Sequence, residues 1–117
     1  MFKEIDYQQD YLIGFNSRGE KKIINYDDIY LVESFTHDII VHTSFGGLKI
    51  KERLYEVEGI FENRDIIRIN KSQIIPKGKI MKIIPQYNSK LKILLANKNT
   101  VYVSRMYLMS FREKIGM

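Results

Sequence analysis

A cluster of basic and polar side chains between residues 68 and 82 has the composition of a nucleic-acid site. The run Arg68-Ile69-Asn70-Lys71-Ser72 follows an apolar stretch that is typical of a strand. Lys can address guanine and Asn can address adenine in a major groove, so Lys71 and Asn70 are candidates for base contacts. Phosphate contacts set register without reading sequence; the candidates for them are Arg68, Ser72, Lys77, Lys79 and Lys82. Lys-rich and Asn-rich loops also occur on many soluble surfaces, so the cluster alone leaves an ordinary solvated loop open.

Side chains that could perform catalysis or bind a metal are sparse. The chain has no GxGxxG, GxxxxGK[ST], HExxH or GxSxG motif. Its two histidines, His37 and His42, are five residues apart, which on a strand places them on opposite faces and argues against joint metal ligation. Adjacent Asp27 and Asp28 diverge on an extended segment and are expected at a turn that leads into a strand. The sequence predicts no enzyme, no cofactor and no metal site.

The two histidines have different surroundings. His42 lies within the run from Ile39 to Thr43, and we expect a strand residue that faces solvent or bonds to a neighbour. His37 lies in Thr36-His37-Asp38, between two predicted strands, where a loop could present it to a ligand. An ordinary polar turn is the alternative for His37.

Charge is divided unequally along the chain. Residues 1–65 hold 8 Lys and Arg and 13 Asp and Glu, whereas residues 66–117 hold 11 Lys and Arg and a single acid, Glu113, so the net charges are −5 and +10. A segment with this bias approaches a polyanion at lower cost, because each Lys or Arg near a phosphate releases condensed counterions. Nucleic acid is the natural partner, and a lysine-rich surface that serves solubility is the alternative on charge alone.

Length and composition narrow the class of protein. A chain of 117 residues that is 44% hydrophobic and 28% charged suits one folded domain. Zero cysteines fit a reducing compartment, and there is neither a run of about 18 uncharged apolar residues nor an apolar stretch of the signal-peptide kind. These features predict a cytoplasmic protein with no membrane partner.

Short strands are the elements that must position the candidate side chains. Apolar and β-branched runs alternate with Gly-containing or Asn-containing turns that suit tight hairpins. The predicted strands are 11–15, 22–25, 29–33, 39–43, 48–51, 66–69, 80–85, 91–95 and 101–104. Apolar residues three or four apart predict a helix over Glu52 to Asn63, and a shorter one over Arg105 to Lys114. We expect a mostly β, antiparallel domain over residues 11–117, preceded by a polar N-terminal extension, 1–10.

The order of these segments resembles the LytTR DNA-binding domain over residues 11 to 115. The resemblance begins with Asp28 to Ser34, followed by a His-bearing loop and then the predicted helix with Leu54-Tyr55-Glu56-Val57. The stretch from Ile67 to Ile75 carries the family's Arg-x-x-x-Ser pattern. Ile80-x-x-Ile83, the hairpin through Asn97-Lys98-Asn99 and Val103-Ser104-Arg105-x-Tyr107 complete the order.

The resemblance implies an elongated, mostly antiparallel β fold in which loops enter successive major grooves of DNA without a recognition helix. Carried over residue by residue, it implies base contacts from His37 in the first loop and Lys71 in the second, with Asn70 beside it. The third loop would contribute Arg105 to bases and Ser104 to phosphate.

Two residues depart from the family's pattern. Pro76 stands where Asn is more common, after Ile74-Ile75. Met106 stands where a basic residue is common, and a thioether cannot bind guanine bidentately. Arg105 would then take over part of that role, or Met106 would make an apolar contact with a thymine methyl.

These features together predict a bacterial transcription regulator that binds double-stranded DNA sequence-specifically, with a second copy possible on repeated DNA sites. LytTR domains commonly follow a receiver domain, so the resemblance also implies a response regulator of a two-component system. The alternative is a small β-rich module that binds a protein partner and has no nucleic-acid role. RNA binding is less favoured, because no aromatic-rich RNP-like strand is present.

Overall fold

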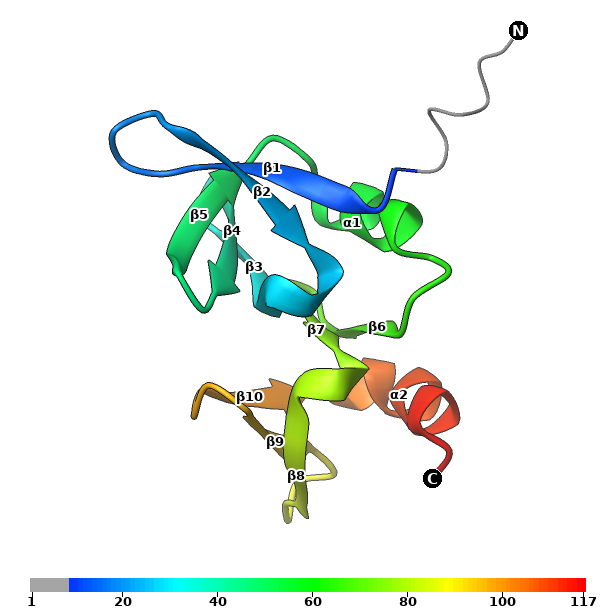
Figure 1. Cartoon of the computed structure of the whole chain (residues 1–117). Helices are drawn as coiled ribbons and strands as arrows, with labels where there is room; N and C mark the ends of the chain where they lie inside the picture. The colour runs from blue at the N-terminus through cyan, green and yellow to red at the C-terminus, as the bar shows by residue number, and fades with distance from the viewer. Residues whose placement is uncertain (1–8) are drawn as a thin grey trace, which may run out of the picture.

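Ten strands and two α-helices occupy residues 9–117, the part of the chain that this computed structural model describes (Figure 1). The strands are β1 (Tyr11–Phe15), β2 (Lys21–Asn25), β3 (Ile29–Phe35), β4 (Asp38–Thr43), β5 (Gly46–Ile50), β6 (Ile66–Asn70), β7 (Gln73–Pro76), β8 (Ile80–Pro85), β9 (Leu91–Leu95) and β10 (Thr100–Val103). The helices are α1 (Leu54–Ile60) and α2 (Leu108–Ile115), and 3-10 turns span Tyr26–Asp28, Lys77–Lys79 and Arg105–Tyr107. Most of the predicted extension, residues 1–8, lies outside the described residues.

The strands form two antiparallel sheets. The larger has the order β2-β1-β5-β4-β3-β7-β6 and the smaller has the order β10-β9-β8. Strand β1 meets β5 at one register pair, Phe15 with Lys49. Gly14 permits this close approach, because a Cβ on it would lie 2.7 Å from Ile24 Cδ1 and 2.8 Å from Leu48 Cβ.

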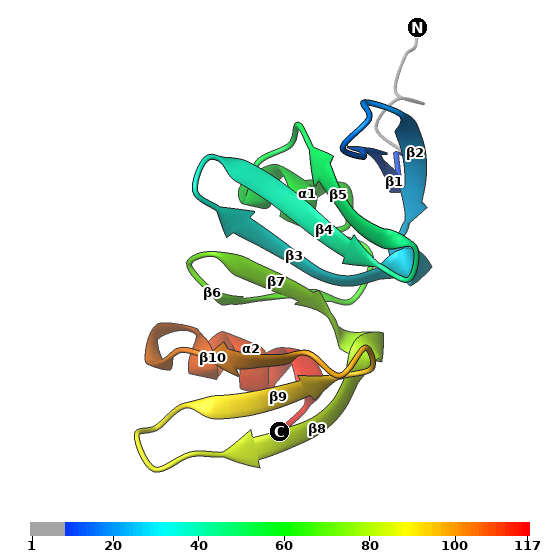
Figure 2. The same ribbon diagram turned by 90° about the vertical axis from the view of Figure 1, so that its left-hand side faces the viewer.

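The smaller sheet lies below the larger one in Figure 2, so the molecule is extended in one direction. Its principal dimensions are 49 × 36 × 24 Å. The elongated, mostly antiparallel β fold that the sequence predicts is confirmed, as is the short C-terminal helix.

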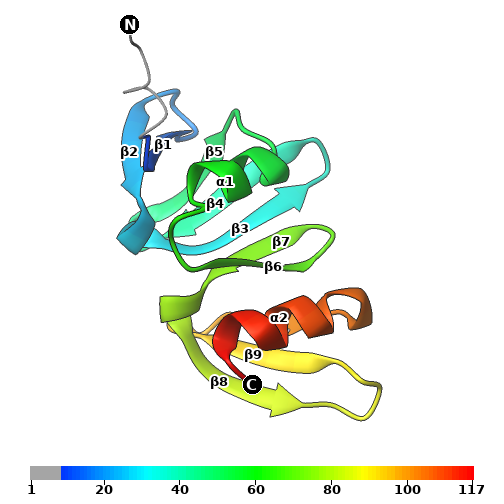
Figure 3. The ribbon, with the colours of Figure 1, turned by 90° about the vertical axis from the view of Figure 1, so that its right-hand side faces the viewer.

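Two hydrophobic cores lie on either side of the β6–β7 hairpin. The first is enclosed by the larger sheet and α1, which contributes the buried Leu54 and Val57. The second is enclosed by the smaller sheet and α2, which contributes the buried Phe111 (Figure 3). In β9 the buried residues alternate with half-buried ones, as expected for a strand that turns one face to a core.

Residues of the β6–β7 hairpin enter both cores. Ile66 and Ile74 belong to the first core, whereas Ile67, Ile69 and Ile75 belong to the second. A strand that is covered on both faces reads as a nearly continuous apolar run, which is the pattern found here. The hairpin is therefore a wall shared by the two cores, and the packing on both of its faces holds the two strands that its turn joins.

One missed strand and two predicted helix boundaries are corrected. Strand β7 is absent from the predicted strands. Helix α1 is shorter than the predicted 52–63, because Arg53 is extended (φ −84°, ψ 164°) and Phe61 leaves the helical region (φ −105°, ψ 25°). The predicted helix over Arg105 to Lys114 begins with the 3-10 turn, and α2 starts only at Leu108. Across residues 9–117, none of the helices is long and apolar enough to cross a membrane.

Candidate nucleic-acid interface

Three turns lie next to one another along one edge of the molecule, hereafter the interface edge. They are the β3–β4 turn at residues 36–37, the β6–β7 turn at residues 71–72 and the segment after β10 at residues 104–106. The Ser34 N–H donates to the Ser72 carbonyl at 2.8 Å, which ties the first turn to the second. The Ser104 N–H donates to the Ile69 carbonyl at 3.0 Å, which ties the third to the second. The turns are seen at the left of Figure 2 and at the right of Figure 3.

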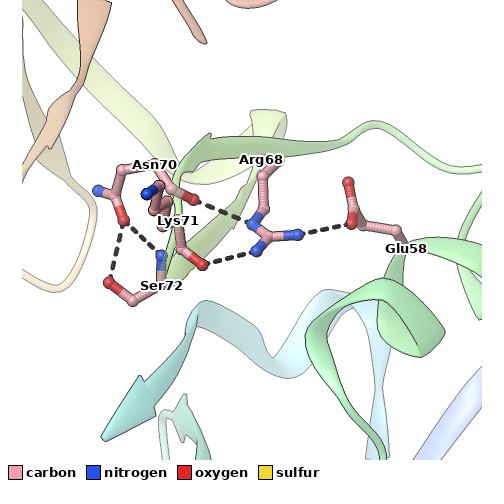
Figure 4. A network of polar contacts seen from close by, with 5 residues as sticks. All are labelled: Glu58, Arg68, Asn70, Lys71 and Ser72. Carbon is pink, nitrogen blue, oxygen red and sulfur yellow. Dashed lines mark hydrogen bonds and ion pairs between the residues drawn. The ribbon is translucent and has the colours of Figure 1, made fainter. Parts of the chain in front are cut away.

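The Arg68 guanidinium braces the β6–β7 turn from inside the molecule (Figure 4). Its Nε donates to the Asn70 carbonyl at 2.9 Å, and its Nη2 donates to the Lys71 carbonyl at 2.6 Å. Its Nη1 donates to Glu58 Oε1, on α1, at 2.9 Å. Every guanidinium nitrogen thus has an intramolecular partner, and the side chain is only 24% exposed. The structure places Arg68, a predicted phosphate contact, as a support of the turn.

The Asn70 side-chain amide is a second brace. Its Oδ1 accepts from the Ser72 N–H at 2.9 Å, and the Ser72 hydroxyl lies 3.3 Å from the same atom. Its Nδ2 donates to Gln73 Oε1 at 2.8 Å and to the Tyr102 carbonyl at 3.0 Å. Asn70 therefore joins the turn to β10, and both ends of its amide are used within the protein.

A row of polar side chains continues this brace across three strands of the larger sheet. Gln73 Nε2 donates to Glu33 Oε1 at 3.1 Å, and Glu33 Oε2 lies 2.6 Å from His42 Nε2. His42 is a strand residue that is hydrogen-bonded to a neighbour, as its sequence position predicts. Glu58, Glu33 and Gln73 are not among the predicted site residues, because their contacts cross between elements and no local spacing marks them.

The side chains at the tips of the turns point away from this internal network. His37, Lys71, Arg105 and Met106 are all exposed. Among the described residues, neither the Lys71 ammonium nor the Arg105 guanidinium has an ion-pair or hydrogen-bond partner. A hollow of about 490 Å³ lies between the second and third turns; it is lined by Asn70, Lys71, Ser72, Gln73, Ser104, Met106 and Tyr107. The Lys71 ammonium thus stands without a partner on a backbone that the Arg68 side chain holds through hydrogen bonds.

Comparison with known proteins decides the family. A family model described as the LytTr DNA-binding domain matches residues 19–116. The chain belongs to the LytTR family. This is a family of DNA-binding domains from transcriptional regulators and not a family of enzymes.

The LytTR chain is similar to regulators from several bacteria. An uncharacterized HTH-type transcriptional regulator of Staphylococcus aureus (strain NCTC 8325) is 32% identical over 106 residues, which cover 91% of this chain and 71% of that protein. The sensory transduction protein LytT of Enterococcus faecalis is 30% identical over 102 residues, which cover 86% of this chain and 42% of that protein. The solved LytTr DNA-binding domain of a response regulator from Bacillus cereus has a TM-score of 0.86 at 21% identity and covers 92% of this chain and 98% of that one, which shows the shared fold.

The term HTH-type in a relative's name does not describe the LytTR fold seen here. A helix-turn-helix joins two helices by a turn of three or four residues. In residues 9–117 of this chain, five strands separate α1 from α2, so the interface edge is built from turns between strands.

Two of the predicted phosphate contacts lie at the opposite edge of the LytTR domain. The Lys77 ammonium donates to the Lys114 carbonyl at 3.3 Å. The Lys79 ammonium donates to the Asp27 carbonyl at 2.6 Å and lies 5.1 Å from the centre of the Tyr30 ring. Both follow β7, at the end of the β6–β7 hairpin away from its turn. The structure does not bring them to the interface edge.

The structure places Pro76 inside the domain and Lys82 on its surface. Pro76 is buried at the end of β7, where it pairs with Ile66, so this departure from the family's pattern lies away from the Lys71 turn. Lys82 is exposed on β8 in the smaller sheet. Its partner in the sheet is Leu94 of β9.

The adjacent acids Asp27 and Asp28 belong to a turn, and Asp28 has a structural role there. The Asn25 N–H donates to Asp28 Oδ2 at 2.9 Å at the 3-10 turn before β3, as predicted for a turn that leads into a strand. Within residues 9–117, no three His, Cys, Asp or Glu side chains are grouped to hold a metal ion. Burial raises the pKa of Tyr26, with a further rise from the Asp65 carboxylate, and the Tyr26 hydroxyl donates to the Asp65 carbonyl at 2.5 Å. This pair lies away from the interface edge.

Proposed function

We propose that the chain recognises a specific sequence of double-stranded DNA with the three turns of the interface edge, and that it thereby regulates transcription. The observation that supports this most strongly is the contrast within one turn. Arg68 and Asn70 fix the backbone around residue 71, while the Lys71 ammonium has no partner among the described residues. Base reading requires such a preformed backbone, because a bidentate contact tolerates little change in position.

We assign base contacts in the major groove to the exposed tips of the turns. Lys71 and Arg105 are suited to guanine, and Met106 is suited to the methyl group of thymine. His37, on the first turn, is exposed and able to donate or accept a hydrogen bond. The third turn therefore combines one cation with one apolar side chain, a different chemistry from that of the second.

We assign phosphate contacts at the interface edge to Ser72 and Ser104, and we keep Lys82, which is exposed on β8 of the smaller sheet, as a predicted phosphate contact of that sheet. Arg68 and Asn70 are positioning residues in this scheme, because the protein itself already occupies their donor groups. Lys77 and Lys79 remain outside the proposed interface.

We further propose that two copies bind to repeated sites in the cytoplasm, as the output of a two-component signal. The name of the relative LytT, a sensory transduction protein, supports the signalling part. The small size of the domain supports the binding of two copies, since a single small module buries only about 600–1,000 Å² of its surface on DNA. A second copy doubles the length of sequence that is read.

Selection of bound duplexes from a random pool tests the proposal. We expect one short motif to be enriched, and log affinity for it to fall linearly with log salt, with a slope of about −0.9 per phosphate contact. The Lys71→Ala variant, selected in parallel, should lose the preference at one position of the motif. A salt-independent affinity without an enriched motif would contradict the proposal and favour a module that binds a protein partner.

A further inference from the structure

A fourth turn lies on the interface edge beyond the three already described. It is the tip of the β8–β9 hairpin, residues 86–90, seen below the other turns on the same side in Figures 2 and 3. The Gln86 N–H donates to the Lys90 carbonyl at 2.9 Å, and Ser89 takes the left-handed conformation with φ = 62°. The tip is a closed turn that holds its side chains outward.

Tyr87, at this tip, is fully exposed. Tyrosine combines an apolar ring with a hydroxyl donor, and the two together suit a contact surface that is apolar at one end and polar at the other. Among residues 9–117, nothing covers the ring and no hydrogen bond reaches its hydroxyl. The side chain therefore contributes nothing to the packing of this fold, and a partner would supply the contacts that it lacks.

The smaller sheet that carries this tip has no acidic residue. The sequence contains no Asp or Glu between Asp65 and Glu113. On the outer face of the sheet, Lys92 is paired with Ile84 on one side and Tyr102 on the other. Lys90 stands at the tip itself and is exposed. A surface that presents lysine and tyrosine without any acid is complementary to a phosphate backbone.

We propose that the β8–β9 tip contacts the sugar–phosphate backbone of the same duplex, outside the bases read by the three turns. Tyr87 would donate its hydroxyl to a phosphate and lay its ring against the sugar, and Lys90 would pair with a phosphate. The inference rests on the proposed function, because it places DNA along the interface edge. The four turns follow one another along one side of the molecule in Figures 2 and 3, so a duplex that lies along this edge can contact both the three turns and the tip.

Duplex length separates this contact from base reading. Two duplexes carry the selected motif: a long one with about ten extra base pairs on each side, which is about one helical turn, and a short one trimmed to the motif. The wild-type chain is compared with the double variant Tyr87→Ala/Lys90→Ala. The control is Lys98→Ala, because Lys98 lies at the tip of the β9–β10 hairpin, at the opposite end of β9. Affinity is measured against salt, and hydroxyl-radical cleavage maps the protected sugars.

On the long duplex, the double variant should lose protection on one flank of the motif, and its salt slope should become shallower by about 1. On the short duplex, it should bind like the wild type and keep the same base preference. Lys98→Ala should match the wild type throughout. A double variant that keeps the full footprint and slope on the long duplex overturns the inference and leaves the proposed function standing. Absence of salt-dependent binding by the wild type to either duplex overturns both.

Discussion

The β6–β7 and β8–β9 hairpins are the same motif in two settings. Both are antiparallel pairs whose turns lie on the interface edge, but only β6–β7 is covered on both faces. Arg68 and Asn70 brace its turn, whereas the β8–β9 tip is closed by the backbone bond from Gln86 to Lys90. The difference matches the role proposed for each hairpin. The β6–β7 turn would read a base, which needs a fixed backbone, whereas the β8–β9 tip would pair with a phosphate, which needs only a charge within reach.

The largest expected effect concerns packing. Ile75, in β7, is fully buried, so Ile75→Ala should lower the free energy of unfolding by about 2–5 kcal/mol. Ile84, in β8, is partly exposed, and Ile84→Ala should cost about 1 kcal/mol or less. Denaturant titration measures both. Equal losses would mean that the two hairpins do not differ in their contribution to the cores.

The next effect concerns the brace. Arg68→Ala should lower the free energy of unfolding by about 1.5–3 kcal/mol, because it removes hydrogen bonds that involve charged groups, and base preference should weaken at the same time. Arg68→Lys keeps the charge but not the fork of donors, so it should not restore that preference.

Glu58→Gln gives the decisive comparison for Arg68. If Arg68 acted only through phosphate, removal of the Glu58 charge would strengthen DNA binding. If Arg68 instead positions the turn, Glu58→Gln should weaken the preference for the correct base, since the ion pair between Glu58 and Arg68 at 2.9 Å would be weakened. A competition assay between the selected motif and its single-base variants measures this directly.

A smaller effect is expected at the tip of the braced turn. Lys71→Ala should cost about 1–3 kcal/mol of binding at one position of the motif, with little change in stability, because the side chain is exposed. Lys79→Ala is the matched control from the other end of the hairpin, and it should leave the affinity for DNA unchanged. Uniform weakening by both variants would contradict the assignment.

The smallest effect should come from the β8–β9 tip. Ser89 has φ = 62°, a conformation that glycine adopts without cost, so Ser89→Gly should raise the free energy of unfolding by less than about 1 kcal/mol. Thermal unfolding followed by circular dichroism is sensitive enough. A clear loss of stability would show that the Ser89 side chain supports the tip.

Short apolar and β-branched runs bounded by turn residues were sufficient to predict nine of the strands, including β6, which turns both faces to a core. Strand β7 was not predicted, because it has only four residues and ends in Pro76. A proline within an apolar run argues against a strand. The fold tolerates Pro76 because it stands at the strand's end. Helix α1 was predicted too long, since the apolar spacing continues to the buried Phe61 after the helix has ended.

The exposed tips of the site could be predicted from residue type and family pattern, but their supports could not. Arg68 has the residue type of a phosphate contact, but its guanidinium is bonded to Glu58, which lies on a helix ten positions earlier in the sequence. Asn70 likewise meets the Tyr102 carbonyl across 32 positions of sequence. Contacts of this kind depend on how elements pack, which local spacing does not encode. The roles of the individual tips stay predictions until DNA binding is measured.

The shared wall formed by β6 and β7 has a thermodynamic consequence. Because its isoleucines enter both cores, unfolding of the hairpin would expose both cores at once, and we expect the two cores to unfold in one transition. A duplex held by the Lys71 turn binds only the folded state and should stabilise it by about 2.7 kcal/mol at a free concentration a hundred times its Kd. The midpoint temperature of thermal unfolding would then rise with the fraction of the domain that is bound to DNA.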